Sequence, residues 1–435
     1  MKKLVLALLV AAANVAAAQA DPIELQWWHA MTSVNADRIN KIASDFNAAQ
    51  SEYKVTPVFK GSYAETMTAA IAAYRAGNAP DIVQVFEVGT ATMMAAKGAV
   101  KPVYQLMADA GETFDPATYL PAVTAYYSTP DGKMLSLPFN SSTPVVYWNK
   151  EAFKKAGLDP DKPPKTWPET FEAAKKLRAG GVPCGFTSAW VSWVQIENFS
   201  AWHNIALATK ANGLGGPDAV LEFNNPTVTR HIANLAEAQK DKSFDYGGRE
   251  TQPEPKFISG DCGMIQDSSA AYGMFKNSAK FEWGVTQLPY YPDVAGAPQN
   301  SIIGGASLWV MAGKKPEQYK GIARFFTYLS GVPVQKTWHE QTGYLPITKA
   351  AYEATKAEGF YAKNPGTEIA ILQMTGKPPT ENSRGLRFGN MVQIRDVIAE
   401  DLEGAFSGKM TAKAALDDAV NRGNALLRQF QKNTQ

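Results

Sequence analysis

The sequence predicts an α/β protein with two domains. Its 435 residues exceed the size at which a single hydrophobic core usually stops growing. The composition, 45% hydrophobic and 19% charged, is typical of a globular chain. From Ile23 onward, segments with the two-residue repeat of strands alternate with segments that have the longer repeat of helices. This alternation is typical of a doubly wound α/β sheet.

Residues 1–20 have the pattern of a secretory signal peptide. Lys2 and Lys3 precede the apolar run Leu4–Val10, and the small residues of 18–20 form a cleavage site. The apolar run is shorter than the roughly 20 residues that a membrane-spanning helix needs. We therefore expect an exported and soluble mature chain.

Charge and cysteine content argue against several kinds of partner. Removal of the first 20 residues takes away two of the 43 basic residues and none of the 41 acidic ones, which leaves no net charge. No basic stretch supports nucleic-acid binding. Cys184 and Cys262 could form one disulfide or remain two buried thiols, because their geometry decides this. Together with four scattered histidines they match no zinc spacing, so we expect no metal and no other cofactor.

The first part of the chain alternates strands and helices. Strands are predicted at 23–27, 53–59 and 81–86, with helices from about 35 and over 65–75. Tyr63 lies in the loop after the second strand, and Glu87 directly follows the third. Ligands of doubly wound sheets bind at the carboxyl ends of strands, so both are candidate contacts. Alternatively, Tyr63 packs on the surface and Glu87 is a solvated residue at a helix start.

The stretch 137–167 has the composition of a ligand cleft. A small polar cluster at 140–143, which includes Ser142, is followed by an apolar strand over 145–148 and later by Trp167. A few fixed polar groups with aromatic walls often form a site for a small polar ligand. The alternative is an ordinary core strand with a polar loop before it. The same choice, core or ligand contact, applies to Trp190, Trp193 and Trp202.

Two further positions in the middle of the chain are candidates. Helices are predicted near 150, 167 and 226, with strands at 182–186 and 263–265. Ser268 stands where the second strand leads into a helix. A helix N-terminus attracts anions, although Ser268 could simply cap its own helix. Residues 299–311 are predicted as a strand interrupted at Gly304 and Gly305, which is either a plain bulge or a crossing that offers the Gly305 N–H to a ligand.

The C-terminal part is predicted to be largely helical. Helices are expected around 322–329 and 334–339. Tyr344 then lies in a connection, where it could also be an ordinary loop aromatic. Arg395 has more apolar neighbours than most arginines of this chain, and arginine has the shape for bidentate phosphate recognition.

Long blocks of the chain resemble the solute-binding proteins of ABC importers. They include PFNSSTPVVYWNKEAFKKAGLDP, AGAPQNSIIGGASLWVM, TGYLPITKAAY and GLRFGNM. The last three look specific to the glycerol-3-phosphate-binding branch. The resemblance implies a type II, maltose-binding-protein-like fold with a cleft between two lobes. Its N-lobe would comprise 21–138 plus 306–342, its C-lobe 142–302 plus 346–435, and the chain would cross near 137–142, 302–306 and 343–347.

By this resemblance the ligand contacts would be Tyr63, Glu87, Ser142, Ser268, Gly305, Tyr344 and Arg395, with Trp167 as a weaker candidate. Arg395, the two serine hydroxyls, Tyr344 and the Gly305 N–H would hold a phosphate. Glu87 would bind glycerol hydroxyls, away from the phosphate end, and Tyr63 would orient or cover the ligand.

The resemblance also implies the biological setting: a monomeric periplasmic protein that is not an enzyme, captures sn-glycerol 3-phosphate and delivers it to a membrane permease. A glycerophosphodiester such as glycerophosphocholine is an alternative ligand, as is a sugar. A secreted hydrolase is the remaining alternative, because carboxylate pairs cannot be recognised from sequence. No H-E-x-x-H or G-x-S-x-G motif supports it.

Overall fold

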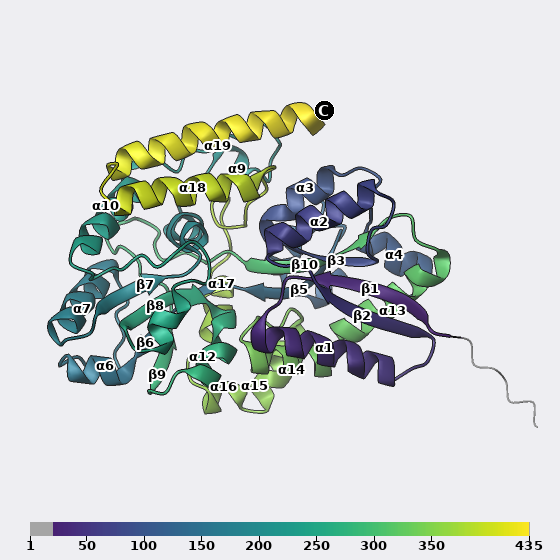
Figure 1. Cartoon of the computed structure of the whole chain (residues 1–435), viewed down its shortest axis with the longest axis horizontal. Helices are drawn as coiled ribbons and strands as arrows, with labels where there is room; N and C mark the ends of the chain where they lie inside the picture. The colour runs from purple at the N-terminus through teal and green to yellow at the C-terminus, as the bar shows by residue number, and fades with distance from the viewer. Residues whose placement is uncertain (1–20, 435) are drawn as a thin grey trace, which may run out of the picture.

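Residues 21–434, which the computed structural model describes, form two α/β lobes, each around its own sheet (Figure 1). The expected signal peptide, residues 1–20, lies outside the described residues. The first sheet, on the right in Figure 1, has the order β2-β1-β3-β10-β4, and β5 also pairs with β10. Its strands are β1 (Ile23–His29), β2 (Tyr53–Phe59), β3 (Ile82–Phe86), β4 (Val100–Lys101), β5 (Leu137–Ser142) and β10 (Gly304–Met311).

The second sheet, on the left in Figure 1, has the order β7-β8-β6-β9. Its strands are β6 (Pro144–Asn149), β7 (Cys184–Ser188), β8 (Cys262–Ser268) and β9 (Trp283–Thr286). In the first sheet β1 runs parallel to β2 and β3, whereas β10 is antiparallel to its neighbours. In the second sheet β7 and β8 are parallel and the other pairs antiparallel. Each lobe therefore contains one mixed sheet, which packs against helices.

Helices cover both sheets. The first lobe has α1 (Ser33–Ala48), α2 (Tyr63–Arg75), α3 (Thr90–Ala95), α4 (Val103–Ala110), α5 (Pro121–Tyr127), α13 (Pro316–Ser330) and α14 (Val332–Thr342). The second has α6 (Lys150–Lys155), α7 (Trp167–Ala179), α8 (Phe199–Trp202), α9 (Thr209–Asn212), α10 (Pro226–Lys240), α11 (Glu254–Ile258), α12 (Tyr272–Ser278), α18 (Met391–Phe406) and α19 (Ala412–Thr434). Between the lobes lie α15 (Lys349–Ala357), α16 (Phe360–Lys363) and α17 (Ile369–Thr375).

Local sequence signals explain where several helices begin. At α2, the Ser62 side chain accepts a hydrogen bond from the Glu65 N–H, and the Glu65 carboxylate accepts one from the Ser62 N–H. Thr166 and Glu169 form the same reciprocal pair at the start of α7. Each pair satisfies two N–H groups that a helix start leaves without backbone partners. The predicted helices of these regions are therefore confirmed close to their expected starts.

The chain passes from the first sheet to the second at Thr143, which separates β5 from β6. Ser141, two residues before Thr143, is paired with Gly305 of β10, and its carbonyl accepts a hydrogen bond from the Leu345 N–H at 2.7 Å. Three segments that are distant in sequence thus lie side by side between the lobes. The lobe boundaries given above remain predictions.

The strand predicted over 299–311 is shorter than expected. Strand β10 begins only at Gly304, so the two glycines start the strand instead of interrupting it. Residues before it bond elsewhere: the Ser301 N–H donates to the Gln373 carbonyl at 3.1 Å, and the Ile302 N–H to the Asn198 side chain at 2.9 Å. These bonds replace the strand ladder that the apolar pattern suggested.

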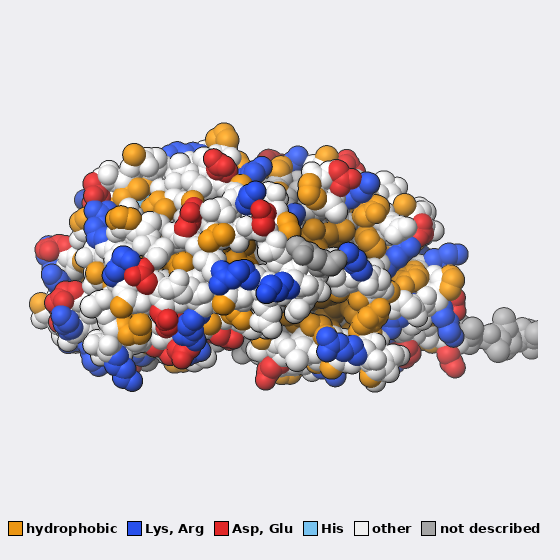
Figure 2. Space-filling view, turned by 90° about the horizontal axis from the view of Figure 1, so that it is seen from above, with side chains coloured by type: hydrophobic (Ala, Val, Ile, Leu, Met, Phe, Trp, Pro, Cys, Tyr) orange, Lys and Arg blue, Asp and Glu red, His pale blue; other side chains and the backbone are white. Residues whose placement is uncertain are grey.

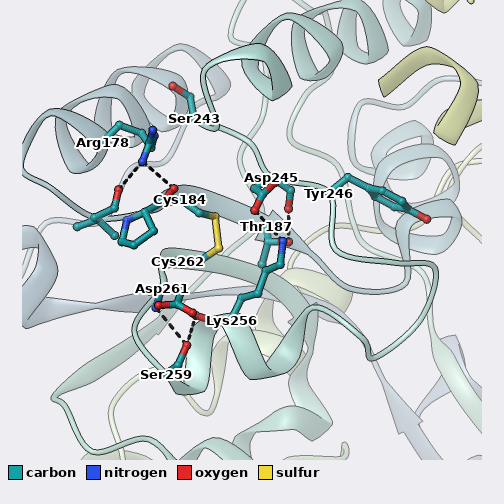
Figure 3. Close-up of a disulfide and its surroundings, with 12 residues drawn as sticks. Arg178, Cys184, Thr187, Ser243, Asp245, Tyr246, Lys256, Ser259, Asp261 and Cys262 are labelled. Atoms are coloured by element: carbon teal, nitrogen blue, oxygen red, sulfur yellow. Dashed lines mark hydrogen bonds and ion pairs between the residues drawn. A yellow bond between two sulfur atoms is a disulfide. The ribbon is translucent and has the colours of Figure 1, made fainter. Parts of the chain in front are cut away.

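The two cysteines form a disulfide inside the second lobe. Cys184 of β7 and Cys262 of β8 are directly paired in the parallel ladder, and a bond joins their sulfur atoms (Figure 3). The sheet register therefore decides the question that the sequence left open. The bond ties together positions 78 residues apart.

Basic and acidic side chains are interspersed over the face shown in Figure 2, without an extended area of one sign. Among residues 21–434, no helix has the length and apolar character needed to cross a bilayer.

We predict that replacing both cysteines by serine lowers the free energy of unfolding by about 2–4 kcal/mol, because a loop of this length adds entropy to the unfolded chain when it is open. Urea unfolding of the variant and the oxidised wild type would measure the difference. Wild-type protein with its disulfide reduced should match the variant. An unchanged unfolding midpoint in both would contradict the prediction.

Candidate ligand-binding site

A cavity of about 420 Å³ lies between the two lobes. Its wall includes residues of β2, β5, β8, β10, α1, α11 and α18, so both lobes contribute to it. All seven predicted contact residues line it: Tyr63, Glu87, Ser142, Ser268, Gly305, Tyr344 and Arg395. The structure thus brings together positions spread over more than three hundred residues of sequence. That they bind a ligand stays a prediction.

Arg395 of α18 is held by two buried carboxylates. Its Nε and Nη2 atoms donate to the two oxygens of Glu197, at 2.7 Å each. Nη2 also donates to Glu87 Oε1 at 2.5 Å. Glu87 comes from the first lobe, in the 3-10 helix η1 (Glu87–Gly89), and Glu197 from the second, in the π-helix η3 (Trp193–Asn198). The guanidinium therefore joins the two lobes through ionic hydrogen bonds.

The Nη1 group of Arg395 is the part left for a ligand. No hydrogen bond joins it to protein among the described residues, and Arg395 lines the cavity. Nη1 carries two N–H donors. An anion in the cavity would thus contact only the Nη1 nitrogen of Arg395, because Glu197 occupies the bidentate edge formed by Nε and Nη2.

Burial and charge act in opposite directions on this ion cluster. Burial by itself lowers the pKa of Arg395, but Glu197 and Glu87 outweigh it and raise that pKa above its ordinary value. Burial raises the pKa of Glu87, an effect that Arg395 opposes. Arg395 therefore remains charged at every physiological pH, and one positive charge is shared between two carboxylates.

The expectation that Glu87 binds away from the phosphate end of the ligand stays a prediction, and the structure places the Glu87 carboxylate next to Arg395. Glu87 is in direct contact with Arg395, the residue expected to bind the phosphate. Sequence position could not show this, because Arg395 reaches across from the other lobe. A ligand bound at Nη1 would lie beside both groups at once.

Tyr63 and Tyr344 are fixed by aromatic stacking and by Asn140. Tyr63 stacks on Phe86 at 5.4 Å between ring centroids, and its hydroxyl accepts a hydrogen bond from Asn140 Nδ2 at 2.8 Å. Tyr344 stacks on Trp338 at 5.5 Å. Burial raises the pKa of both tyrosines, so both hydroxyls remain protonated; the Tyr344 hydroxyl donates to Met31 Sδ at 3.7 Å.

Ser142 and Gly305 belong to neighbouring strands at the cavity wall. Ser142, the last residue of β5, is paired with Gly304, and Ser141 with Gly305. Gly305 has a φ of +91°, and a Cβ there would lie 1.8 Å from the Asn140 carbonyl oxygen. Only glycine fits this position, because both the backbone conformation and the space exclude a side chain.

Two local features of the wall favour an anion. Ser268 ends β8, and its hydroxyl accepts a hydrogen bond from the Ala270 N–H at 3.1 Å, so it caps the short 3-10 helix η4 (Ser269–Ala271) as well as lining the cavity. The first turn of α1, with residues 32–35, also lines the cavity, and Thr32 gives it no side-chain cap. Helix starts present N–H groups and a positive dipole end.

Two aromatic candidates do not line the cavity. Trp167 is buried in the second lobe against His231, at 4.4 Å between ring centroids, so its assignment as a cleft aromatic is wrong. Trp202 is also buried, and its indole N–H donates to the Leu288 carbonyl at 3.1 Å. Trp190 and Trp193 line the cavity as expected. Residue type does not distinguish a tryptophan of the core from one of the cavity wall, and only the packing of the folded chain does.

Sequence reasoning missed Glu197, Asn140 as a support for Tyr63, and the acidic side chains Glu250 and Glu254 of the cavity wall. A signal for Glu197 existed. It stands in the apolar and aromatic run SWVQIENFSAW, where a carboxylate would be buried and would need a cation. Among the described residues, no group of His, Cys, Asp or Glu side chains has the arrangement of a metal site.

Comparison with known proteins agrees with the two-lobe architecture. The family model described as "Bacterial extracellular solute-binding protein" matches residues 41–368, most of the chain. This chain belongs to that family. The sn-glycerol-3-phosphate-binding periplasmic protein UgpB of Brucella abortus (strain 2308) is 53% identical over 405 residues, which cover 93% of each chain.

Solved solute-binding proteins have the same fold. UgpB from Mycobacterium tuberculosis, in complex with glycerophosphocholine, aligns with a TM-score of 0.79 at 21% identity, covering 94% of this chain and 99% of that one. Maltose-bound MalE3 of T. maritima aligns with a TM-score of 0.74 at 17% identity, covering 92% and 98%. The predicted fold class, a two-lobe, maltose-binding-protein-like α/β fold, is confirmed.

We predict that Gly305→Ala destabilises the protein by more than about 2 kcal/mol, since it adds a clash with a backbone carbonyl to an unfavourable φ. Gly313→Ala is the matched control, because Gly313 has a φ of +81° but nothing within 4 Å of an added Cβ. Urea unfolding of both variants would separate strain from clash. Equal losses of stability would show that the contact with Asn140 does not matter.

Proposed function

We propose that this chain is the substrate-binding subunit of an ABC importer. It captures sn-glycerol 3-phosphate, and also glycerophosphodiesters such as glycerophosphocholine, and delivers them to a membrane permease. One observation carries the phosphate assignment: the cavity between the lobes contains an arginine whose Nη1 group has no protein partner among the described residues. The name of the Brucella relative supports the ligand.

In this proposal different residues of the cavity wall bind the phosphate and the glycerol hydroxyls of the ligand. Arg395 Nη1, the hydroxyls of Ser142 and Ser268, and the first turn of α1 hold the phosphate. Glu87 accepts hydrogen bonds from glycerol hydroxyls. The Tyr344 hydroxyl and the Gly305 backbone complete the phosphate side, and Tyr63 covers the ligand. Because glycerol 3-phosphate is small, Glu87 and Nη1 can serve adjacent ligand atoms.

Binding would favour the closed arrangement of the lobes. The pair between Glu87 and Arg395 already bridges them, and a phosphate at Nη1 adds contacts to both walls. A ligand that binds one arrangement better shifts the population toward it. The closed form would dock on the permease as a monomer in the periplasm, after export directed by residues 1–20.

The alternatives fit the cavity less well. A sugar has no anionic group, so it would leave the Nη1 group of Arg395 without a negatively charged partner. A glycosidase needs two carboxyl groups separated by roughly 5–9 Å across the scissile bond. Of the carboxyl groups that line the cavity, Glu87 is paired with Arg395. We therefore propose a binding protein without a catalytic step.

We predict that calorimetric titration of the mature protein with sn-glycerol 3-phosphate gives a dissociation constant in the micromolar range or below, about −8 kcal/mol or stronger. Glycerophosphocholine should compete with it, and maltose should produce no binding heat. Binding of maltose alone would favour the sugar alternative. Absence of heat with all three ligands would refute the proposed ligand class.

We predict that Arg395→Lys weakens phosphate binding roughly 10- to 100-fold, the cost of one charge-assisted hydrogen bond. A lysine ammonium can neutralise Glu197 and Glu87 but has no second nitrogen for the ligand. Arg249→Lys is the matched control, because Arg249 forms a bidentate pair with Glu403 on the surface. If Arg395→Lys binds with an affinity within a few-fold of wild type, Nη1 does not contact the ligand.

A further inference from the structure

A second cavity, of about 350 Å³, lies where the region of α5 meets the segment that precedes α18. We call it the junction pocket. One side of its wall is formed by residues between 116 and 132 of the first lobe, and the other by Leu214, Arg384 and Arg387, which flank α9 and α18 of the second. None of its wall residues lines the cavity that contains Arg395. The junction pocket is therefore separate from the candidate ligand site.

The charge of the junction pocket is positive. The ionisable side chains among the described residues that line it are those of Arg384 and Arg387. Neither arginine forms a salt bridge within the described part of the chain, unlike the other arginines near acidic groups. Two acidic residues neighbour the wall in sequence without lining it: Asp115 caps the 3-10 helix that follows it, and Asp131 pairs with Lys133 at 3.0 Å. No carboxylate thus balances the two guanidinium groups.

The guanidinium of Arg387 is held by the protein through one nitrogen. Its Nη2 donates to the carbonyls of Ala125, Tyr126 and Ser128, at 3.1, 3.1 and 2.9 Å. The Arg387 backbone N–H is fixed as well, since it donates to the Asn212 carbonyl at 3.0 Å. Nε is buried without a hydrogen-bond partner, and no hydrogen bond joins Nη1 to the described residues. Nη1, with its two N–H donors, is the part of the group left for the pocket.

A structural role explains only some of these contacts. The three carbonyls belong to the C-terminal end of α5, and an arginine commonly stabilises the last carbonyls of a helix. Such a cap uses Nη2 and leaves the net charge of Arg387 without an anion. Burial lowers the pKa of Arg387, and no carboxylate opposes that effect, in contrast to Arg395 with its two carboxylates. A helix cap also gives no reason for a second arginine in the same wall.

The hydroxyl of Ser128 is another donor without a protein partner. Ser128 is only 5% exposed and lines the junction pocket. Its backbone is used, because its carbonyl accepts from Arg387 and it forms a strand bridge with Met134. No hydrogen bond joins its Oγ to the described residues, whereas the neighbouring Thr124 hydroxyl donates to the Pro121 carbonyl at 3.2 Å. Since buried hydroxyls are normally hydrogen-bonded, this one indicates a partner from outside the protein.

We propose that the junction pocket is a second anion-binding site, for a small oxyanion such as sulfate or inorganic phosphate. Arg387 Nη1 and the Ser128 hydroxyl donate hydrogen bonds to the anion, and the exposed Arg384 adds a second positive charge. Guanidinium and hydroxyl groups are the donors that oxyanions bind in proteins. Because both lobes supply the wall, a bound anion joins them outside the ligand cavity. The inference does not depend on the identity of the ligand at Arg395.

The test is calorimetric titration of the full mature chain with sodium sulfate, in a buffer of low ionic strength without other multivalent anions. Sulfate keeps its two charges near neutral pH, so protonation of the probe does not complicate the result. We expect a dissociation constant of about 1 mM or below. Inorganic phosphate should compete with sulfate for the same site.

Two variants place the bound sulfate in the junction pocket. Ser128→Ala removes a hydroxyl that has no protein partner, so the unfolding midpoint should not change while sulfate binding weakens roughly 3- to 10-fold, the cost of one hydrogen bond. Arg384→Gln should weaken binding by at most roughly fivefold, because the charge is exposed. Arg428→Gln is the matched control, since Arg428 is also exposed but lies on α19 outside the pocket; it should bind sulfate like the wild type.

Arg395→Lys separates the junction pocket from the ligand cavity, where sulfate can also meet an arginine. Sulfate binding that persists in Arg395→Lys and weakens in Ser128→Ala supports the inference. Sulfate binding that is lost in Arg395→Lys and unchanged in Ser128→Ala overturns it. Absence of sulfate binding by the wild type, or an equal loss in Arg384→Gln and Arg428→Gln, overturns it as well. Each of these outcomes leaves the proposed capture of glycerol 3-phosphate intact, since that ligand is titrated separately.

Discussion

The contact of Arg395 with Glu87 and Glu197 is the constraint on which the site depends. A guanidinium with only 15% of its side chain exposed must be paired, because a lone buried charge costs several kcal/mol. Two lobes supply the two carboxylates, so the pairing is complete only when the lobes lie together. The same pairing leaves one nitrogen toward the cavity. The requirement that stabilises the buried charge therefore also prepares the site for an anion.

The backbone around Ser141 gives this arrangement its precision. Strand β5, the start of β10 and the segment at Leu345 meet there through strand pairing and one further hydrogen bond. Gly305 permits the close approach, since a Cβ would occupy the space of the Asn140 carbonyl. Three candidate contacts, Ser142, Gly305 and Tyr344, thus come from segments that the backbone fixes relative to one another. Rigid positioning of this kind lowers the entropic cost of ligand binding.

Buried carboxyl groups near this cavity are held in two different ways. Glu87 and Glu197 share the guanidinium of Arg395. Asp267 forms no salt bridge within residues 21–434; its Oδ1 accepts a hydrogen bond from the Ser268 N–H, and its Oδ2 has no hydrogen-bond partner there. Burial therefore raises the pKa of Asp267 without a cation to oppose it. The contrast is a matter of which side chains lie nearby, since the three groups are chemically alike.

Sequence by itself determined the fold class, most helices and strands, and the seven residues that the structure brings to one cavity. The repeat of apolar residues along the sequence was enough to predict elements such as β2 and α2, because such a repeat involves only residues that are close in the chain. Local patterns made Ser142, Ser268 and Arg395 candidates beside an ordinary structural alternative, and resemblance to known blocks favoured the ligand-binding interpretation. Tertiary structure alone decided the disulfide, the shortened β10 and the exclusion of Trp167 from the cavity. It alone revealed that Glu197 holds Arg395, because pairing across distant segments is set by packing and leaves no periodic trace in sequence.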